Sequence, residues 1–345
     1  MQRRAKILIA LGLIIAVAVV VISVWLIIPR VRRKVVRIGI TQIVDHPALN
    51  AVRDGFIEVM ADNGYGEGEN VTYDIQNAQG DMATASTIAH KFVSDKVDLI
   101  LSIATPTSQA AVNATTTIPI VFSAVTDPVG AGLVKSLENS GNNVTGMSDL
   151  TPVQRQFELI KTILPKAKAV GTLYNAAEAN SVLTNELAKE ACKKLGLGLV
   201  EATVSSSADV FLAAQSLVGR CDAIYVSTDN TTVSALDAVV QVTNKNNIPL
   251  VLADPTTVNK GALLALGFDY YDHGRETAPI AIKVLKGTKP SDIPVKFAKE
   301  LELWVNLNIA TQIGFPPSSL LDTCKAFAGE LKGEGVKVDV KVIGE

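Results

Sequence analysis

The sequence predicts an α/β protein in which two doubly wound parallel-sheet lobes are joined by a multi-strand hinge and preceded by one N-terminal transmembrane helix. Three observations lead to this prediction. Apolar, strand-like runs alternate with amphipathic helical stretches along most of the chain. The same strand–helix–strand–helix–strand pattern occurs twice. A long apolar run without charge lies near the N-terminus.

Residues 7–29 (ILIALGLIIAVAVVVISVWLIIP) form the charge-free run. As a helix, at about 1.5 Å per residue, this run is longer than the ~30 Å hydrocarbon core of a bilayer. No small-x-small cleavage site precedes the basic cluster that follows, and no Cys offers a lipid-attachment site. We therefore expect residues 1–34 to be an uncleaved membrane anchor with basic flanks. The flanking charges weakly favour a cytoplasmic body, but the function inferred below requires an extracytoplasmic one.

The first lobe begins with the strand-like run RIGITQ at 37–42. The helix predicted next, 47–64, has apolar residues at helical spacing and ends at Gly64. The run VDLILSIA at 97–104 is apolar throughout, as in a strand whose sheet is covered on both faces. The remaining elements of this lobe are strands at 71–78 and 118–125 and helices at about 81–94 and 106–114.

The pattern then begins again in the second lobe. VDLILSIAT in the first half matches CDAIYVSTD in the second, and IPIVFSAVTDP matches IPLVLADP. One βαβαβ unit therefore looks duplicated, and right-handed crossovers would give each copy a parallel sheet. The strands of this lobe are predicted at 168–175, 197–204, 221–229 and 248–254, with helices at 177–195, at 207–218 and between the last two strands.

Chain crossings at about residues 150, 269 and 290 would form the hinge. Near the C-terminus, valines alternate with charged residues from Val336 to Val342, which indicates an edge strand or a loosely ordered tail. The predicted domains are the anchor 1–34, a first lobe of 35–150 plus about 270–317, a second lobe of 151–269, and a C-terminal extension of 318–345.

The composition excludes several classes of partner. The net charge is −2 and the pI about 6.0, and no basic stripe is interleaved with aromatic residues, so we expect no nucleic-acid binding. Cys192, Cys221 and Cys324 are far apart and form no CxxC motif. Buried structural thiols are the favoured interpretation, and a Cys192–Cys221 disulfide stays open as an alternative.

Ligands of doubly wound sheets bind outside the carboxyl ends of the strands. Short polar side chains follow nearly every predicted strand of this sequence, and several of them open a helix. Helix N-termini offer free N–H groups that suit a carboxylate, and facing Asp side chains could hold an ammonium, so the set suits a zwitterion such as an amino acid. The candidate ligand-binding residues are Thr41, Gln42, His46, Thr105, Pro106, Thr107, Ser108, Thr126, Asp127, Asn175, Glu178, Asn180, Ser181, Thr228, Asp229, Asn230, Asp254 and Asp269.

Individual members of this set have plainer interpretations. Thr105, Ser108, Asp127 and Asn230 could serve only as helix N-caps, which need no ligand. Their recurrence at strand ends in both halves favours a shared site. From this set we expect Thr41 or Gln42 to hydrogen-bond the ligand.

Catalysis and metal binding find little support. The Asp45–His46 pair would need a nucleophile, and no GxSxG motif is present, so we predict no catalytic residue and no enzyme activity. His90 and His273 are isolated on predicted helices and form no ligand cluster, so no metal site is predicted. GYGEG at 64–68 ends a helix rather than opening one, and no Walker A motif occurs, so no cofactor is expected.

Seven motifs stand out together along the chain: IVDHPALNAVRDGF (43–56), NAQGD (77–81), ATPTSQAA (104–111), AVTDPVGAGLV (124–134), NVTGMSDL (143–150), YNAAEANS (174–181) and STDNT (227–231). Together they resemble the substrate-binding proteins of ABC importers, in the family that includes the tryptophan- and tyrosine-binding members. The resemblance covers about residues 36–316. The sequence lacks the lipobox Cys of many relatives, its DPTTVNKG turn departs from the expected pattern, and the tail beyond Pro317 is additional.

The resemblance implies a periplasmic-binding-protein-like fold whose two lobes close on a small ligand, an aromatic or other apolar amino acid, and deliver it to membrane permease subunits. It places the opening loop and the turns at 105–108, 126–128, 175–181 and 228–230 on the cleft, with His46 shaping the rim. The helix opening at 105–108 should hold the ligand carboxylate, and Asp229 or Asp269 its ammonium. The alternative is a membrane-tethered sensor with the same fold. A kinase gene next to the gene for this chain would favour the sensor, whereas neighbouring permease and ATPase genes would favour transport.

Overall fold

The computed structural model describes residues 16, 17, 19 and 35–344 of the 345-residue chain. The chain divides into two compact units, Met1–Val35 and Val36–Glu345, and the second contains every element discussed below. The predicted anchor at 7–29 lies, apart from three residues, outside the described part. Within the described residues, no helix has the length and hydrophobicity that crossing a bilayer requires.

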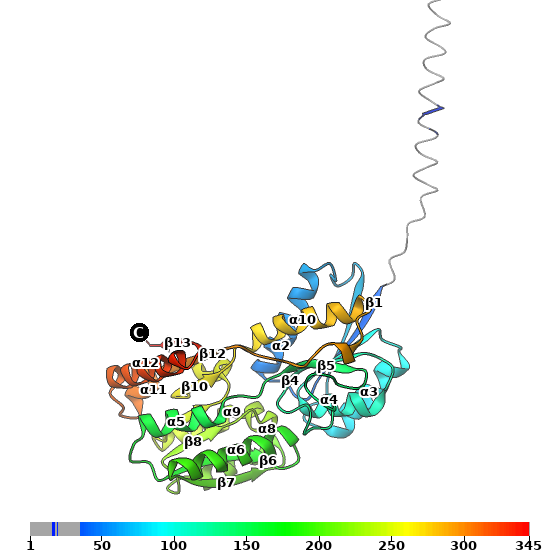
Figure 1. Ribbon diagram of the computed structural model, residues 1–345. Coiled ribbons are helices and arrows are strands. Elements are labelled where there is room, and N and C mark those ends of the chain that lie inside the picture. Colours follow the sequence, from blue (N-terminus) through cyan, green and yellow to red (C-terminus); the bar gives the residue numbers. More distant parts are fainter. Residues whose placement is uncertain (1–15, 18, 20–34, 345) are drawn as a thin grey trace, which may run out of the picture. The chain divides into compact units, whose positions relative to one another are not determined.

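The second unit is an α/β structure in which strands and helices alternate (Figure 1). Its strands are β1 (Val36–Gln42), β2 (Val71–Asn77), β3 (Leu99–Ile103), β4 (Ile120–Val125), β5 (Val144–Ser148), β6 (Ala169–Asn175), β7 (Gly198–Val204), β8 (Ala223–Val226), β9 (Leu250–Leu252), β10 (Leu264–Gly267), β11 (Lys296–Phe297), β12 (Glu300–Asn306) and β13 (Lys337–Ile343). Its helices are α2 (Pro47–Asp62), α3 (Met82–Ser94), α4 (Thr105–Ala114), α5 (Val153–Ile163), α6 (Ala179–Leu195), α7 (Val210–Ser216), α8 (Asn230–Ser234), α9 (Leu236–Lys245), α10 (Tyr270–Leu285), α11 (Leu307–Gln312) and α12 (Pro317–Gly333), with short 3₁₀ turns η1 (Ser207–Asp209), η2 (Pro255–Lys260) and η3 (Pro290–Asp292).

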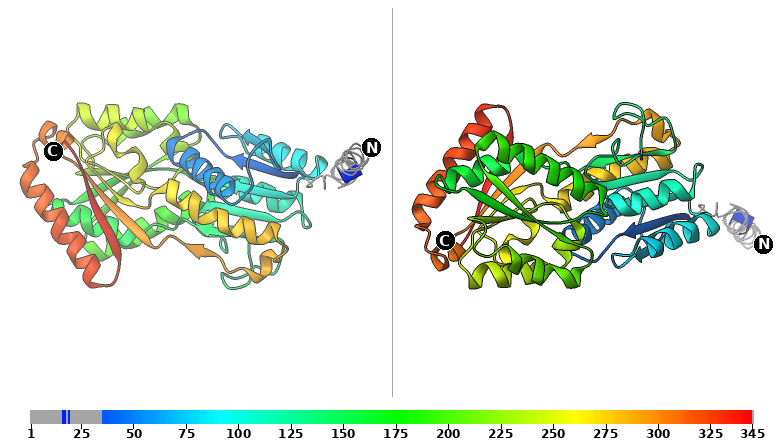
Figure 2. Two further views of the ribbon diagram at one scale, coloured as in Figure 1. Left: turned by 90° about the horizontal axis from the view of Figure 1, so that it is seen from above. Right: turned by 90° about the horizontal axis from the view of Figure 1, so that it is seen from below.

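The first lobe is built on a six-stranded sheet in the order β11-β5-β4-β3-β1-β2, in which all pairings are parallel. The central strands β3 and β4 are buried along their whole length. This burial explains their unbroken apolar sequences, because helices cover both faces of a parallel sheet. Helix α10 returns to this lobe and packs along α2. Figure 2 shows the covering helices from two opposite sides.

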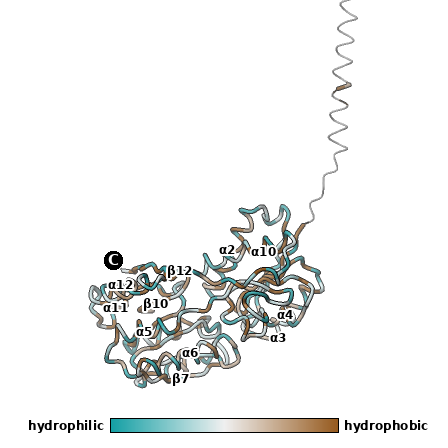
Figure 3. The backbone as a smooth tube through the Cα atoms, viewed as in Figure 1, coloured by the Kyte–Doolittle hydropathy of each residue, from teal (hydrophilic) through white to brown (hydrophobic). Residues whose placement is uncertain are grey.

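The second lobe is built on a seven-stranded sheet in the order β13-β12-β10-β9-β8-β6-β7. Its strands are parallel except at β12, which runs antiparallel to β10, while β13 runs parallel to β12. Alternate residues face opposite sides of the sheet, so Val251 packs into one apolar cluster and its neighbours Leu250 and Leu252 into another. Hydrophobic segments run through both lobes between hydrophilic ones (Figure 3). The prediction of two parallel-sheet lobes is confirmed.

Three chain segments join the lobes. The first follows β5 and leads into α5, the second connects β10 to α10, and the third is the two-residue link between β11 and β12. The third crossing therefore lies at residues 298–299, later than the expected position near 290.

The C-terminal part differs from the predicted domain boundaries. Residues 300–317 were assigned to the first lobe, but β12 pairs with β10 through Leu264–Val305 to Gly267–Glu302 and so belongs to the second sheet. The extension 318–345 is not a separate tail, because most of α12 and β13 lie in it and β13 pairs with β12 along seven residues. The apolar alternation indicated the strand but carried no information on its partner.

The three cysteines are free thiols, so the alternative of a Cys192–Cys221 disulfide is not formed. Cys192 and Cys324 are buried, and burial raises the pKa of the Cys192 thiol to about 11. These thiols are therefore protonated and unreactive at neutral pH.

Candidate functional site

A small cavity lies between the lobes, at the carboxyl ends of the strands of both sheets. Its volume is about 20 Å³. The first lobe contributes His46 and Leu49 at the start of α2, and the second contributes Thr228–Asn230 and Asp254. Asp149 and Tyr270, which stand on two of the crossing segments, complete the wall. Carboxyl strand ends are where doubly wound sheets bind ligands, so this cavity marks the candidate site.

Two buried carboxyl groups dominate the cavity. Asp149 accepts a hydrogen bond from Tyr270 Oη at 2.9 Å and another from Thr126 Oγ1 at 3.1 Å. Burial raises the pKa of Asp149, and hydrogen bonds from Tyr270 and Thr126 only partly offset that effect. Asp254 accepts from the Thr256 backbone N–H through Oδ1, whereas its buried Oδ2 has no hydrogen-bond partner in the described residues.

The electrostatics of Asp254 are unfavourable for a carboxylate. Burial, assisted by the neighbouring charges of Asp149 and Asp269, raises the pKa of Asp254 to about 6, although hydrogen bonds from Thr256 lower it. A buried negative group without a bonding partner is costly unless a proton or another cation accompanies it. No Lys or Arg lines the described cavity, so the arrangement favours a cationic group of a ligand beside Asp254 and Asp149.

Asp229 lies in the same wall but has both of its oxygens bonded. Oδ1 accepts from the Thr232 N–H and Oδ2 from the Asn175 N–H, each at 2.6 Å. The first bond caps α8 and the second fastens the end of β6 to the end of β8. Asp229 therefore holds the second-lobe loops in place, and its carboxylate has little capacity left for a ligand.

Glu178, at the N-terminus of α6, is the centre of a second-lobe network. Its carboxylate accepts from Asn230 Nδ2 at 2.5 Å, from Thr231 Oγ1 at 2.7 Å and from Asn180 Nδ2 at 3.2 Å. Burial and the charge of Asp229 raise the pKa of Glu178. Asn180 also donates to Thr228 O. These contacts bring the predicted residues of two second-lobe turns, Asn175–Ser181 and Thr228–Asn230, into one bonded group.

The N-terminus of α4 forms the first-lobe counterpart. Ala104 precedes the helix with φ 82° and ψ 158°, a backbone region that residues other than glycine rarely occupy, and no side chain caps the helix. The Thr105 hydroxyl is buried without a partner in the described residues. Thr107 and Ser108 instead donate their hydroxyls back to Ile103 O and Ala104 O. The backbone amides and Thr105 thus remain as donors for an anion, while the two other hydroxyls stabilise the turn.

The opening loop after β1 has a structural and a cleft-facing part. Gln42 donates to Val44 O and to Asn50 Oδ1, so its side chain braces the loop. His46 stands at the cavity beside Asn230 of the opposite lobe, and burial lowers the pKa of His46 to about 4. His46 is therefore neutral at neutral pH.

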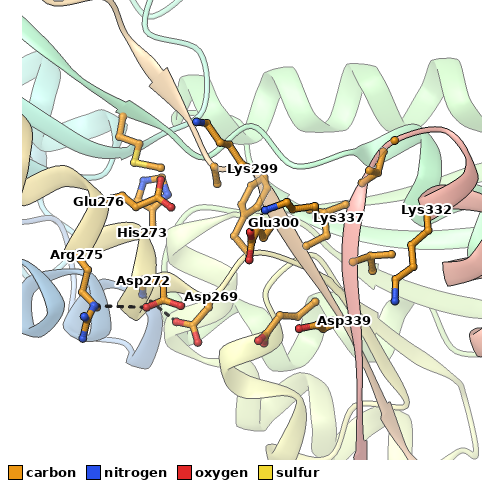
Figure 4. Close-up of a pocket in the computed structure, with 18 of the residues that line it drawn as sticks. Asp269, Asp272, His273, Arg275, Glu276, Lys299, Glu300, Lys332, Lys337 and Asp339 are labelled. Carbon is orange, nitrogen blue, oxygen red and sulfur yellow. Dashed lines mark hydrogen bonds and ion pairs between the residues drawn. The ribbon is translucent and has the colours of Figure 1, made fainter.

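Five of the predicted residues line the cavity itself: His46, Thr228, Asp229, Asn230 and Asp254. Asp127 and Asp269 instead serve local structure elsewhere. Asp127 Oδ1 accepts from the Val129 and Gly130 N–H groups and closes a surface turn. Asp269 caps α10 by accepting from the Tyr271 and Asp272 N–H groups. Asp269 lines a separate groove of about 810 Å³ between α10 and the β12–β13 edge, shown in Figure 4 with Lys332 and Lys337 on its far side.

Residue patterns did not single out Asp149 and Tyr270 as site residues. The sequence nevertheless pointed near both residues, since Asp149 lies within the motif NVTGMSDL and Tyr270 directly follows the predicted site residue Asp269. Each stands at a crossing segment, and only the folded arrangement brings the two within hydrogen-bonding distance. Within the described residues, no group of His, Cys, Asp and Glu side chains is arranged to hold a metal ion.

The lobes contact each other across the site. Helix α4 of the first lobe touches α6 of the second, and α2 touches η2. A cavity of about 20 Å³ accommodates roughly one water molecule. An amino acid can therefore enter only if the lobes separate, and the structure corresponds to a closed arrangement.

Comparisons with known proteins identify the relatives of this chain. It is 47% identical over 79% of its length to the tyrosine-binding protein of Clostridioides difficile, of which 79% is covered. It is 35% identical to an ABC domain from Streptococcus pneumoniae whose crystal structure contains L-Trp, with a TM-score of 0.80 and coverage of 84% of this chain and 98% of that one. A ligand-free, open substrate binding protein from Clostridium difficile is 45% identical, with a TM-score of 0.63 and coverage of 82% and 96%.

The similarity to the L-Trp complex is greater in shape, although the open protein is closer in sequence. This difference agrees with the closed arrangement of the lobes. The family model described as ABC transporter substrate binding protein matches residues 37–321, which include both sheets apart from β13. The chain belongs to the family of ABC transporter substrate-binding proteins.

Proposed function

We propose that this protein binds an aromatic amino acid, tyrosine or tryptophan, between its lobes and presents it to the permease of an ABC importer without converting it chemically. The names of the tyrosine-binding relative and of the L-Trp complex support this ligand class. The observation that carries the proposal is Asp254 Oδ2, which is buried without a partner in the described residues beside Asp149 in the interlobe cavity. An ammonium group supplies both the hydrogen bond that Oδ2 lacks and a positive charge that balances the carboxylate.

The carboxylate end of the ligand binds at the N-terminus of α4. Free backbone N–H groups and the helix dipole favour an anion there, and the buried Thr105 hydroxyl adds a donor. The ammonium end lies beside Asp254 and Asp149. This assignment replaces Asp229 and Asp269 as ammonium partners, because both are engaged in capping their own helices.

Four further unsatisfied polar atoms serve the rest of the ligand. Thr41 Oγ1, His46 Nδ1, Asn180 Oδ1 and Thr228 Oγ1 are buried without partners in the described residues, and they come from strand ends or helix starts of both lobes. Groups of this kind orient a ligand when the lobes close around it. Gln42, Glu178 and Asp229 hold the loops that carry these groups through the bonds described above.

Ligand binding works through hinge closure. The open form exposes Asp254 and the α4 N-terminus to water, and the ligand joins them by bridging the lobes. The ligand-bound form holds the lobes wider apart than the cavity of about 20 Å³ in this structure. Because the ligand makes its full set of contacts only with both lobes closed around it, it shifts the population toward that form. Two of the three crossing segments carry Asp149 and Tyr270 directly at the cavity, so ligand charge and hinge position are coupled.

The proposed location is the outer face of the cytoplasmic membrane, with residues 7–29 as a single-pass anchor and the two lobes outside, where they meet the permease. Neither a cofactor nor nucleic acid takes part. Residues 37–321 match binding proteins of transporters, which supports import over the sensor alternative.

Calorimetric titration tests the ligand assignment. Tyrosine and tryptophan should bind, whereas tyramine, which lacks the carboxylate, and 3-(4-hydroxyphenyl)propionate, which lacks the ammonium, should each bind roughly 100-fold more weakly or not at all. Leucine and glucose serve as controls for side chain and ligand class. Tight binding of a sugar, with no response to any amino acid, would refute the proposal.

A further inference from the structure

The second sheet ends in a strand with one open edge. Among the described strands β13 pairs only with β12, from Glu300–Lys337 to Asn306–Ile343. Its other edge therefore presents backbone N–H and C=O groups outward, as a template for a further strand. The family match ends at residue 321, so β13 lies beyond the part that the chain shares with the family pattern.

The side chains of β13 alternate between two surfaces. Lys337, Asp339 and Lys341 are exposed, whereas Val338 is buried and Val340 is partly buried against the second-lobe core. Edge strands of monomeric proteins are commonly protected by charged side chains, by proline or by a covering loop. Here the exposed face carries charges of both signs, and Asp339 and Lys341 flank Val340.

We propose that β13 pairs antiparallel with β13 of a second copy of this chain, in a register centred on Val340. In that register Asp339 lies opposite Lys341 of the other copy, twice by symmetry, and Val338 lies opposite Val342. Directly opposed residues of an antiparallel pair project from the same face, so Asp339 and Lys341 each meet the opposite charge and the valines meet valines, while Lys337 lies opposite Ile343. The two seven-stranded sheets then form one continuous sheet.

Other registers of the same strand are electrostatically worse or pair fewer of its residues. Centring the pair on Asp339 would place Asp339 against itself and Lys337 against Lys341. Centring it on Lys341 would place Lys341 against itself, and a parallel in-register pair would oppose every charge to its own copy. Like charges directly opposite one another are destabilising in sheets. Centring on Val338 also opposes Lys337 to Asp339, but it pairs only three residues of β13 with one another, whereas the register centred on Val340 pairs all seven.

Disulfide trapping in the full chain tests this register. Val340 lies on the two-fold axis, where opposed Cα atoms of an antiparallel pair are about 4.5–5.5 Å apart, within the range of a disulfide. Val340→Cys should therefore form a covalent dimer under mild oxidation. Val342→Cys is the matched control, because it faces Val338 and not its own copy. Cys192 and Cys324 are buried, and the unmodified chain gives the background from the native thiols.

Charge exchange in the Val340→Cys background separates this pairing from chance collisions. Asp339→Lys alone and Lys341→Asp alone each create two like-charge pairs and should slow dimer trapping about tenfold. The combined exchange Asp339→Lys/Lys341→Asp restores opposite charges and should restore trapping to within about twofold. Thermal melting and ligand titration show that each variant is folded.

Three results would overturn the proposal: no covalent dimer from Val340→Cys, equal trapping of Val342→Cys, or trapping that is indifferent to the charge reversals. Capture of a different protein by Val340→Cys, in place of a second copy, would equally show that another strand occupies this edge.

Discussion

At the scale of single residues, the cleft contains carboxylates with opposite roles. Asp229 accepts two backbone N–H bonds and stabilises the loops around it, whereas Asp254 has one oxygen bonded and one without a partner in the described residues. The difference lies in which backbone amides surround each side chain. In a closed cleft without a ligand, the carboxylate of Asp254 is therefore buried with one oxygen lacking a hydrogen bond. The carboxylate of Asp229 has both oxygens bonded and is not destabilised in this way.

Replacing Asp254 by Asn should weaken tyrosine or tryptophan binding roughly 100-fold, because the amide has no charge to offer an ammonium. Asn can still accept from the Thr256 N–H, so the fold is retained. His46→Ala, the comparison variant, should lose about tenfold or less, since His46 contributes only one neutral contact. Calorimetry of both variants decides the order, and normal binding by Asp254→Asn would contradict the ammonium assignment.

The same substitution should change the pH dependence of stability. The pKa of Asp254 is about 6 in the closed fold and 3.8 ordinarily. Between these values the folded chain retains a proton that the unfolded chain has lost, so the contribution of Asp254 to stability falls as pH rises from about 4 to 6. Asp254→Asn removes this fall. Its ligand-free melting temperature should exceed that of the parent at pH 7.5, by the equivalent of about 1–3 kcal/mol, and match it near pH 4.

Ala104 offers a second residue-scale prediction. Its φ of 82° with ψ 158° places an alanine in a region suited to glycine. Ala104→Gly should therefore raise stability by about 1 kcal/mol in a denaturant titration. Ala83→Gly, in the first turn of α3, should lower it by about 0.5–1 kcal/mol. Destabilisation by both substitutions would mean that the backbone at Ala104 is not strained.

At the scale of elements, the N-termini of helices position most of the polar side chains around the cleft. Helices α4, α6, α8 and α10 all begin at or beside the cleft, and their first residues include most of the predicted set. The sequence revealed these starts because polar residues follow apolar runs. It could not reveal which side chain caps its own helix and which stays available, since that choice depends on loop geometry. Asp269 shows the limit: its place after β10 fitted a ligand contact, yet its Oδ1 accepts from the first N–H groups of α10 and its side chain lines the separate groove.

Asp269→Ala should destabilise the protein by about 1 kcal/mol, because it removes the acceptor for the Tyr271 and Asp272 N–H groups. Ligand affinity should fall by less than about threefold, since the side chain lines the outer groove and not the cavity. Chemical denaturation combined with calorimetry separates the two effects. A large loss of affinity at unchanged stability would return Asp269 to the site.

At the scale of the whole molecule, the duplicated pattern predicted the two sheets but not which sheet the last strands of the chain join. The run ELWVNLN reads as a strand, yet no local feature tells whether it joins the first or the second sheet. That assignment comes from the two-residue link after β11, which leads the chain directly back to β10.

The proposed membrane arrangement makes a further prediction. Protease added to intact cells or spheroplasts should degrade residues 35–345, because the importer role places the lobes outside. A cytoplasmic protein of the same cells controls for lysis. Digestion only after lysis would contradict both the orientation and the import function.

The late return of the chain to both sheets has a consequence for folding. A nascent chain that ends at residue 269 lacks α10 and β11 of the first lobe and β12 and β13 of the second. Neither lobe can then bury its core, and the contacts that complete each one link residues far apart in sequence. Such contacts form slowly. We therefore expect the two lobes to fold together, only after nearly the whole chain has been synthesised, which leaves time for it to cross a membrane unfolded.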